Sequence, residues 1–241
     1  MSDLSILTVL AQVCLLLFLA GLFFKLGSWL KAPRSQAHLP SPGFSGWLKA
    51  LWSTLLDLAF MRKAIRANFY VGFVAWLMHA VMLVLLIGHA RAFGAWSAES
   101  VPEYLQPLFI ELVPTLLGWL LLACLIFLLA RRLTFKLART LFTLRDAVLY
   151  VLLLTAVLAG NFMRLLPAQP EPFEWSPLPG MVLRLEHTPN LAAFAVHAVA
   201  VSILIAYLPF SPLIHIVAGL ASSLSYYRWR LSVEETLRRV V

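Results

Sequence analysis

Five long apolar stretches constrain the fold of this chain more than any other feature of its sequence. A stretch of about 20 apolar residues crosses the roughly 30 Å hydrocarbon core of a bilayer as one α-helix. Apolar residues make up 61% of the chain and charged residues 12%, and the mean hydropathy of +0.87 is far above that of soluble globular proteins. We therefore predict an all-α integral membrane protein in which residues 1–241 form one membrane domain, a bundle of five transmembrane helices. The predicted spans cover about 5–28, 69–91, 108–130, 147–166 and 190–222.

The distribution of Lys and Arg among the loops predicts the orientation of the bundle. Sixteen of the 19 Lys and Arg residues lie in segments 25–66 and 131–145 and in the tail 223–241. Because cytoplasmic loops are enriched in these residues, we place the N-terminus outside and the tail in the cytoplasm. The first span follows Met-Ser-Asp rather than a basic segment, which favours a retained helix over a secretory signal. The net charge of +8 arises from the same loops, so it does not indicate nucleic-acid binding.

The cytoplasmic loop 31–66 contains an amphipathic segment, 44–62. Apolar pairs recur along this segment at helical spacing, whereas Lys49, Ser53 and Asp57 fall on the opposite face. We predict an interfacial amphipathic helix at the cytoplasmic membrane surface. Anchoring in membrane lipid is the favoured role for this helix, and docking of a soluble subunit is the alternative.

Other features of the sequence disfavour several classes of membrane protein. Cys14 and Cys124 lie singly in different spans, so we predict packing roles and no disulfide, zinc or iron–sulfur site. No internal repeat typical of inverted-repeat transporters is visible. Glu111, near Pro114 at the outer end of the third span, is the one candidate for a charged group in a transport pathway. Asp146 opens the fourth span, where a carboxylate suits a helix N-terminus.

Four histidines lie within the apolar stretches, His79 and His89 in the second span and His197 and His215 in the fifth. A polar side chain in hydrocarbon is costly unless it has a partner. Because the two spans run in opposite directions, depth pairs His79 with His215 toward the cytoplasm and His89 with His197 toward the exterior. Two facing imidazoles at each of two depths are what two six-coordinate b-type haems require. Hydrogen-bonded packing histidines and a proton relay are the alternatives.

The spacing of these histidines requires that at least one of the two helices is not straight. Ten residues separate the histidines of the second span and rise about 15 Å, whereas eighteen separate those of the fifth span and would rise about 27 Å. Pro209 and Pro212 lie between the two histidines of the fifth span. We therefore predict a kink at these prolines.

With these residues in place, the chain resembles the cytochrome b family of respiratory nitrate reductase gamma subunits. The family includes the membrane subunits of dissimilatory sulfite-reductase-linked (Dsr) complexes and of membrane-bound heterodisulfide reductases. The resemblance covers the five spans, the outside N-terminus, two histidines in each of the second and fifth spans, and the sequence PFSPLIH at 209–215. It implies two haem b groups, with His79, His89, His197 and His215 as ligands to the iron. It also implies a quinone site beside the outer haem, at Gly88, His89 and Arg91; a packing or topology role is the alternative for Arg91.

The resemblance further implies a function as the haem b membrane subunit of a respiratory multi-subunit oxidoreductase in the inner (cytoplasmic) membrane of a bacterium or archaeon. Such a subunit exchanges electrons between the quinone pool and a cytoplasmic iron–sulfur partner of the heterodisulfide-reductase type, alongside other membrane and periplasmic subunits. It is an electron-transfer subunit, with no catalytic residues for the terminal substrate.

One departure from the family bears on which branch the chain resembles. Nitrate reductase gamma subunits have a Lys near the outer haem, and this chain has none between Lys63 and Lys136. The longer loop 31–66 is also more similar to the Dsr-type branch, which favours a role in sulfur metabolism. A nitrate reductase gamma subunit and a non-redox transporter or assembly factor are the alternatives.

Overall fold

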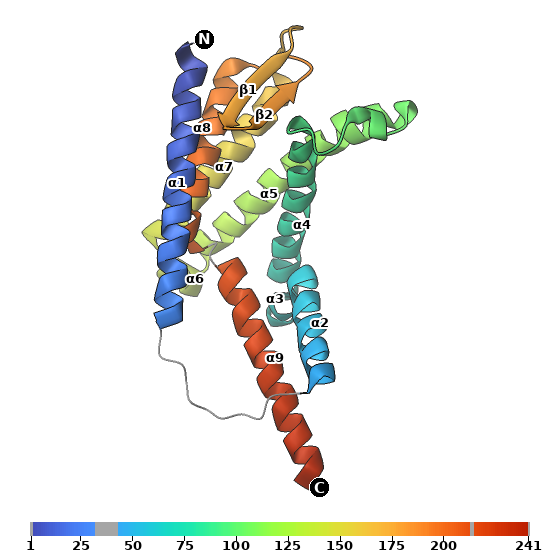
Figure 1. Ribbon diagram of the computed structural model, residues 1–241, viewed down its shortest axis with the longest axis vertical. Coiled ribbons are helices and arrows are strands. Elements are labelled where there is room, and N and C mark those ends of the chain that lie inside the picture. The colour runs from blue at the N-terminus through green and yellow to red at the C-terminus, as the bar shows by residue number, and fades with distance from the viewer. Residues whose placement is uncertain (1, 32–42, 213–214, 241) are drawn as a thin grey trace.

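The computed structural model describes residues 2–31, 43–212 and 215–240. Within these residues, five helical segments are long and apolar enough to cross a membrane, which confirms the predicted multi-pass helical bundle. Figure 1 shows the N-terminus and a β-hairpin at one end of the bundle, and the C-terminus at the opposite end. We call these the N-terminal end and the C-terminal end. The long helices are α1 (Ser2–Lys31), α4 (Phe69–Ala92), α5 (Val113–Thr134), α7 (Leu144–Leu165) and α8 (Leu191–Tyr207).

These helices pack side by side in the order α1, α8, α7, α5 and α4. Val81 of α4 and Leu121 and Leu125 of α5 form a buried apolar cluster in the bundle. Cys14 and Cys124 are buried and free, in agreement with the predicted packing roles. Because α4 packs on α5 while α8 packs on α7 and α1, residues of α4 and α8 are held opposite one another through α5 and α7.

Short helices connect the long ones, and the start of α7 shows how the sequence fixes one such boundary. Thr143 and Asp146 form a reciprocal capping box at the N-terminus of α7. Asp146 also accepts a 2.8 Å hydrogen bond from Nη1 of Arg132, so the carboxylate ties the end of α5 to the start of α7. The predicted place of Asp146 at the start of this span is confirmed. The connecting helices are η1 (Ala98–Ser100), η2 (Glu103–Leu105), the π-helix η3 (Pro107–Leu112) and α6 (Lys136–Thr140).

The prediction of one continuous fifth span over 190–222 is wrong. Helix α8 ends at Tyr207 and is followed by the 3₁₀ turn η4 (Leu208–Phe210). A separate helix, α9 (His215–Val240), then runs to the C-terminal end. Proline has no amide hydrogen and its ring clashes with the preceding helical turn, so the prolines here end the helix instead of only bending it. His197 and His215 therefore lie in two separate helices, so their spacing of eighteen residues does not have to fit one straight helix.

The bundle also contains a β-hairpin that an all-α prediction did not include. Strands β1 (Phe173–Leu178) and β2 (Met181–Leu185) pair antiparallel, and Gly180 has the positive φ of +77° that the turn between them needs. The hairpin lies on α1 and α8. The indole nitrogen of Trp175 donates a 3.0 Å hydrogen bond to Oγ1 of Thr8, and Phe173 packs edge-on against Phe194.

At the C-terminal end, α2 (Phe44–Phe60) and α3 (Arg62–Ala67) lead into α4. The helix predicted over 44–62 is thus confirmed to within two residues. The structure shows that α2 packs against α9, and that its buried residues are the small side chains Gly46, Ala50 and Thr54. We call α2, α3 and α9 together the α2–α9 lobe.

Gly72 sets how closely α4 packs against α3, and we expect Gly72→Ala to destabilise the fold. A Cβ atom at this position would lie 2.5 Å from backbone atoms of Ala64 and Ile65. Backbone cannot move aside as a flexible side chain can, so we expect a loss of about 1–3 kcal/mol, seen as a lower unfolding temperature in detergent. Gly27→Ala is the matched control, because a Cβ there meets no atom within 4 Å. Equal unfolding temperatures for the two variants would contradict this account.

Candidate cofactor-binding site

The structure brings together two of the predicted ligands, His89 of α4 and His197 of α8. Their ring centres lie 6.1 Å apart and their ring planes differ by only 12°. Two imidazoles that share one metal have ring centres about 6 Å apart, because each metal–nitrogen bond is about 2.0 Å and each ring centre lies about 1 Å behind its nitrogen. The separation of His89 and His197 therefore fits a single metal held between them.

Hydrogen bonds orient three of the histidine rings in the same way. The Nδ1 atom of His79 lies 2.7 Å from the carbonyl oxygen of Ala75, and Nδ1 of His89 lies 2.7 Å from that of Leu85. The Nδ1 atom of His197 lies 2.8 Å from a carbonyl oxygen of α7. A carbonyl oxygen only accepts, so the proton of each neutral ring belongs on Nδ1. Each Nε2 then keeps a free lone pair, which is the arrangement typical of metal-ligating histidines.

Helix α7 holds the ring of His197 in place. The carbonyl of Ala156 is the acceptor for Nδ1, and Gly160, one turn further along the same face, lies beneath the ring. A Cβ atom at Gly160 would come within 3.2 Å of Nδ1 of His197, so a side chain at this position would crowd the ring. Gly88 on α4 differs, because a Cβ there would meet no atom within 4 Å. The role of Gly88 beside a haem edge stays a prediction.

The predicted inner pair, His79 and His215, is described only in part. His79 is partly buried in α4, ten residues before His89, and has the hydrogen bond to Ala75 described above. Helix α9 begins at His215, but the side chain of this residue lies outside what the structure describes. The pairing of His79 with His215 therefore stays a prediction.

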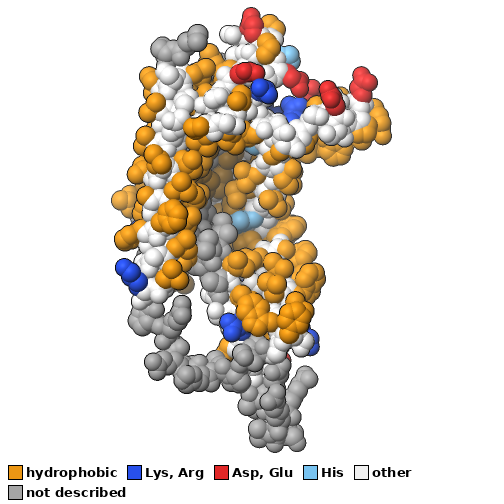
Figure 2. Space-filling view, viewed as in Figure 1, with side chains coloured by type: hydrophobic (Ala, Val, Ile, Leu, Met, Phe, Trp, Pro, Cys, Tyr) orange, Lys and Arg blue, Asp and Glu red, His pale blue; other side chains and the backbone are white. Residues whose placement is uncertain are grey.

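Arg91, predicted to contact quinone, lies in the last turn of α4, at the N-terminal end of the bundle. Its Nη1 atom is 3.3 Å from Oε1 of Glu186, which follows strand β2. Arg91 thus links α4 to the hairpin, which agrees with the packing role that the sequence left open. Acidic and basic side chains gather at this end of the bundle, and Figure 2 shows them above a surface that is mainly apolar.

Two polar residues of α7 near this end were not singled out from the sequence. Arg164 lines a surface groove with residues of η3 and α5, among them Glu111 and Thr115. Asn161 is 4% exposed, and a Cβ atom at Gly118 of α5 would collide with its Oδ1. Within the described part of the chain, its Nδ2 has no hydrogen-bond partner. The sequence carries no signal for either residue, because what each contacts depends on how α5 and α7 pack.

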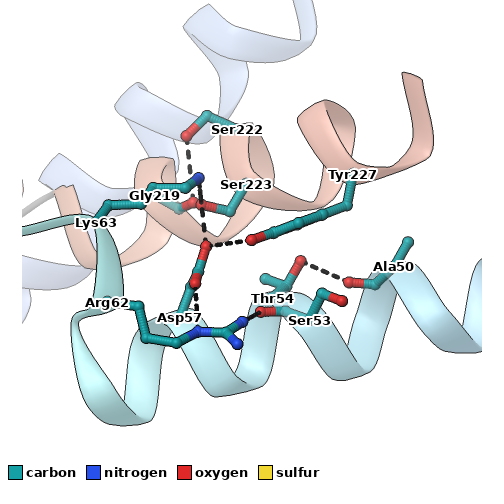
Figure 3. Close-up of polar contacts among 10 residues, drawn as sticks. All are labelled: Ala50, Ser53, Thr54, Asp57, Arg62, Lys63, Gly219, Ser222, Ser223 and Tyr227. Carbon is teal, nitrogen blue, oxygen red and sulfur yellow. Dashed lines mark hydrogen bonds and ion pairs between the residues drawn. The ribbon is translucent and has the colours of Figure 1, made fainter. Parts of the chain in front are cut away.

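Asp57 is the centre of a second polar cluster, in the α2–α9 lobe, which Figure 3 shows in detail. Its Oδ1 accepts a 2.8 Å hydrogen bond from Nε of Arg62, and its Oδ2 accepts a 2.6 Å hydrogen bond from the hydroxyl of Tyr227 in α9. Nζ of Lys63 lies 3.5 Å from Oδ2. The side chain of Asp57 is 7% exposed, so it was correctly predicted to be on the polar face of α2, but this face is covered by α9.

The surroundings of Asp57 favour its charged form. Burial raises the pKa of the carboxyl group, but the hydrogen bonds from Tyr227 and Arg62 and the positive charges of Arg62 and Lys63 outweigh burial and lower it. The same hydrogen bond raises the pKa of the Tyr227 hydroxyl. Asp57 is therefore a charged group that joins α2 and α3 to α9.

The outward face of α2 is apolar and exposed. Figure 2 shows apolar side chains across this lobe. A helix with small buried residues on one face and large exposed apolar residues on the other suits a position at a lipid or protein surface. The location of α2 in the membrane interface itself stays a prediction. The exposed residues of this face include Phe44, Leu48, Trp52, Leu55 and Phe60.

Among the residues that the structure describes, no three His, Cys, Asp or Glu side chains come close enough to hold a metal ion by themselves. The facing pair His89 and His197 thus offers two nitrogen ligands. A porphyrin offers the other four ligands of a six-coordinate iron, so the residues present fit haem.

Comparisons of the chain with protein-family models, with curated proteins and with solved structures find no match.

Proposed function

We propose that this chain is a haem b membrane subunit that conducts electrons across a bilayer. The observation that carries the proposal is the geometry of His89 and His197, whose nearly parallel rings lie 6.1 Å apart. Two further observations support it. Each ring has its Nδ1 at hydrogen-bond distance from a backbone carbonyl, and the two helices that carry the rings are held apart through α5 and α7. When bound, haem supplies reversible one-electron transfer between its ferric and ferrous states.

A second haem site is proposed at His79 and His215. The hydrogen bond from His79 to Ala75 leaves the Nε2 of His79 free in the same way as that of His89. Ten residues of α4 separate His79 from His89, a rise of about 15 Å along the helix. With haems at these two depths, electrons could pass from one haem to the other on their way between the two ends of the bundle.

The two ends of the bundle are proposed to serve different partners. At the N-terminal end, taken as the outer side, Gly88, His89 and Arg91 form the proposed quinone site. At the C-terminal end, the α2–α9 lobe is proposed to dock a cytoplasmic iron–sulfur subunit of the heterodisulfide-reductase type. The chain then belongs to a respiratory complex in the cytoplasmic membrane of a bacterium or archaeon. Sulfur metabolism is favoured, and a nitrate reductase gamma subunit is the alternative.

A reduced-minus-oxidised visible spectrum of the purified protein, with haem quantified per polypeptide, tests the proposal. We expect the spectrum of low-spin haem b and two haems per chain. One haem per chain would keep the electron-transfer role and remove one of the two proposed sites. Absence of haem, in folded protein produced with an adequate haem supply, would overturn the proposal in favour of a non-redox membrane protein.

A further inference from the structure

Arg91 and Arg164 place two positive charges on the side of the His89–His197 pair that faces the N-terminal end of the bundle. Arg91 lies two residues after His89 in α4. Arg164 follows Gly160 by one turn on the same face of α7, and Gly160 lies against the ring of His197. From Gly160 to Arg164 the helix rises about 6 Å toward the N-terminal end. Both arginines therefore lie on the same side of the histidine pair, and they come from different helices.

Two acidic residues lie near these cations: Glu186 beside Arg91, and Glu111, which lines the same surface groove as Arg164 without forming an ion pair with it. Arg91 is in the last turn of α4 and Arg164 is in the last turn of α7, so both guanidinium groups lie at the same end of the bundle. Glu186 lies 3.3 Å from Arg91, but its side chain is 71% exposed, and such ion pairs contribute little to stability. Arg164 forms no ion pair with any residue that the structure describes. Two neighbouring guanidinium groups at the edge of an apolar bundle suit a ligand with two negative charges.

We propose that Arg91 and Arg164 bind the two propionate carboxylates of the haem held by His89 and His197, an inference that rests on the proposed function. Haem carries both carboxylates on one edge of the macrocycle, and that edge then points toward the N-terminal end. A guanidinium group binds a carboxylate through two parallel hydrogen bonds, which fixes orientation as well as charge. Arg91 thereby acquires a role in haem binding besides its place in the proposed quinone site.

The inference is tested by haem affinity in the full-length protein, in a His79→Ala background that removes the second proposed site. We expect Arg91→Gln and Arg164→Gln each to weaken haem binding about tenfold, because each loses a charge-assisted hydrogen-bonded pair. The midpoint potential of the remaining haem is expected to fall, since removing a nearby cation favours the more positive ferric state. Arg184→Gln is the matched control, because Arg184 lies at the same end but pairs with exposed Glu174 in the hairpin.

A modified haem tests the same contact without any change to the two arginines. Haem dimethyl ester keeps the iron and the ring but has no carboxylate charge. We expect the dimethyl ester to bind the chain with both arginines only as weakly as haem binds the chain in which both arginines are replaced. Replacing the arginines should then cause no further loss of affinity for the ester. Arg91→Lys and Arg164→Lys should retain part of the affinity, because the charge remains while the two parallel hydrogen bonds are lost.

The possible failures are distinguishable. If haem and its dimethyl ester bind equally well to chains with both arginines, or if the glutamine variants keep the original affinity and midpoint potential, the inference about the arginines is overturned while haem binding stands. If the unsubstituted protein binds no haem at all, the proposed function itself fails. Unfolding temperatures of each variant show whether a loss of affinity reflects a loss of fold.

Discussion

Replacing His197 with leucine is expected to reduce the haem content of the purified protein from two haems per chain to one. A haem held by His89 and His197 would lose one of its two histidine ligands, because leucine has no nitrogen to replace the imidazole. The substitution also removes the hydrogen bond to the carbonyl of Ala156. His89→Leu is expected to remove the same haem. The measurement is the haem-to-polypeptide ratio together with the reduced-minus-oxidised spectrum.

His187→Leu is the matched control for this experiment. His187 is exposed and lies between the hairpin and α8, outside the helices, so its loss is expected to leave both haems in place. The identity of the lost haem tests the pairing by depth. If His79→Leu removes the same haem as His197→Leu, the proposed pairing is wrong. If the His197→Leu variant retains two haems, the facing rings of His89 and His197 do not support the proposed function.

Replacing Asp57 with leucine is expected to release α9 from α2. The substitution leaves Arg62, Lys63 and the Tyr227 hydroxyl without the carboxylate that joins them. Removing one partner from a buried charged cluster costs about 3–5 kcal/mol, and the partial exposure of Arg62 and Lys63 places the expected loss near the lower value. Limited proteolysis and hydrogen exchange of residues 223–234 measure the release. Because α9 begins at the proposed ligand His215, we also expect lower occupancy of the second haem site.

Glu234→Gln gives the matched control in the same helix. Glu234 pairs with Arg230 one turn earlier on α9, and both side chains are exposed, so this substitution is expected to leave the stability of the fold nearly unchanged. Equal protease sensitivity of the two variants would show that Asp57 does not hold α9 in place.

The pH dependence of the Asp57 contact has a defined sign. The pKa of Asp57 in the folded protein lies below its ordinary value, so the folded state favours the carboxylate. This stabilisation is fully present above the unfolded pKa of about 3.9, and it is lost as the pH falls from there through the lower folded pKa. We expect α9 to stay protected from proteolysis between about pH 5 and 8 and to become sensitive only in more acidic solution. In Asp57→Asn, protection is expected to be weaker and to lack this acid-dependent step.

The sequence by itself determined the features that depend on local composition and spacing. Runs of apolar residues long enough to cross a bilayer specified the long helices, because a backbone surrounded by lipid must form its hydrogen bonds within the helix. The place of Asp146 at the start of the fourth span was predicted from the sequence, and the structure adds its capping box with Thr143. Opposite directions of the second and fifth spans sufficed to pair His89 with His197 by depth, and the structure brings these two residues together.

Only the tertiary structure decided the features that depend on packing between distant residues. Pro209 and Pro212 predicted a kink within one fifth span, but only the structure shows that α8 ends before them and that α9 is a separate helix. Asp57 was expected on the polar face of the interfacial helix, and its side chain is buried because α9 returns to cover that face of α2. The position of Arg164 beside the histidine pair depends on Gly160 allowing α7 to approach His197. Such contacts join residues far apart in the chain, and periodicity within one helix contains no information about its neighbours.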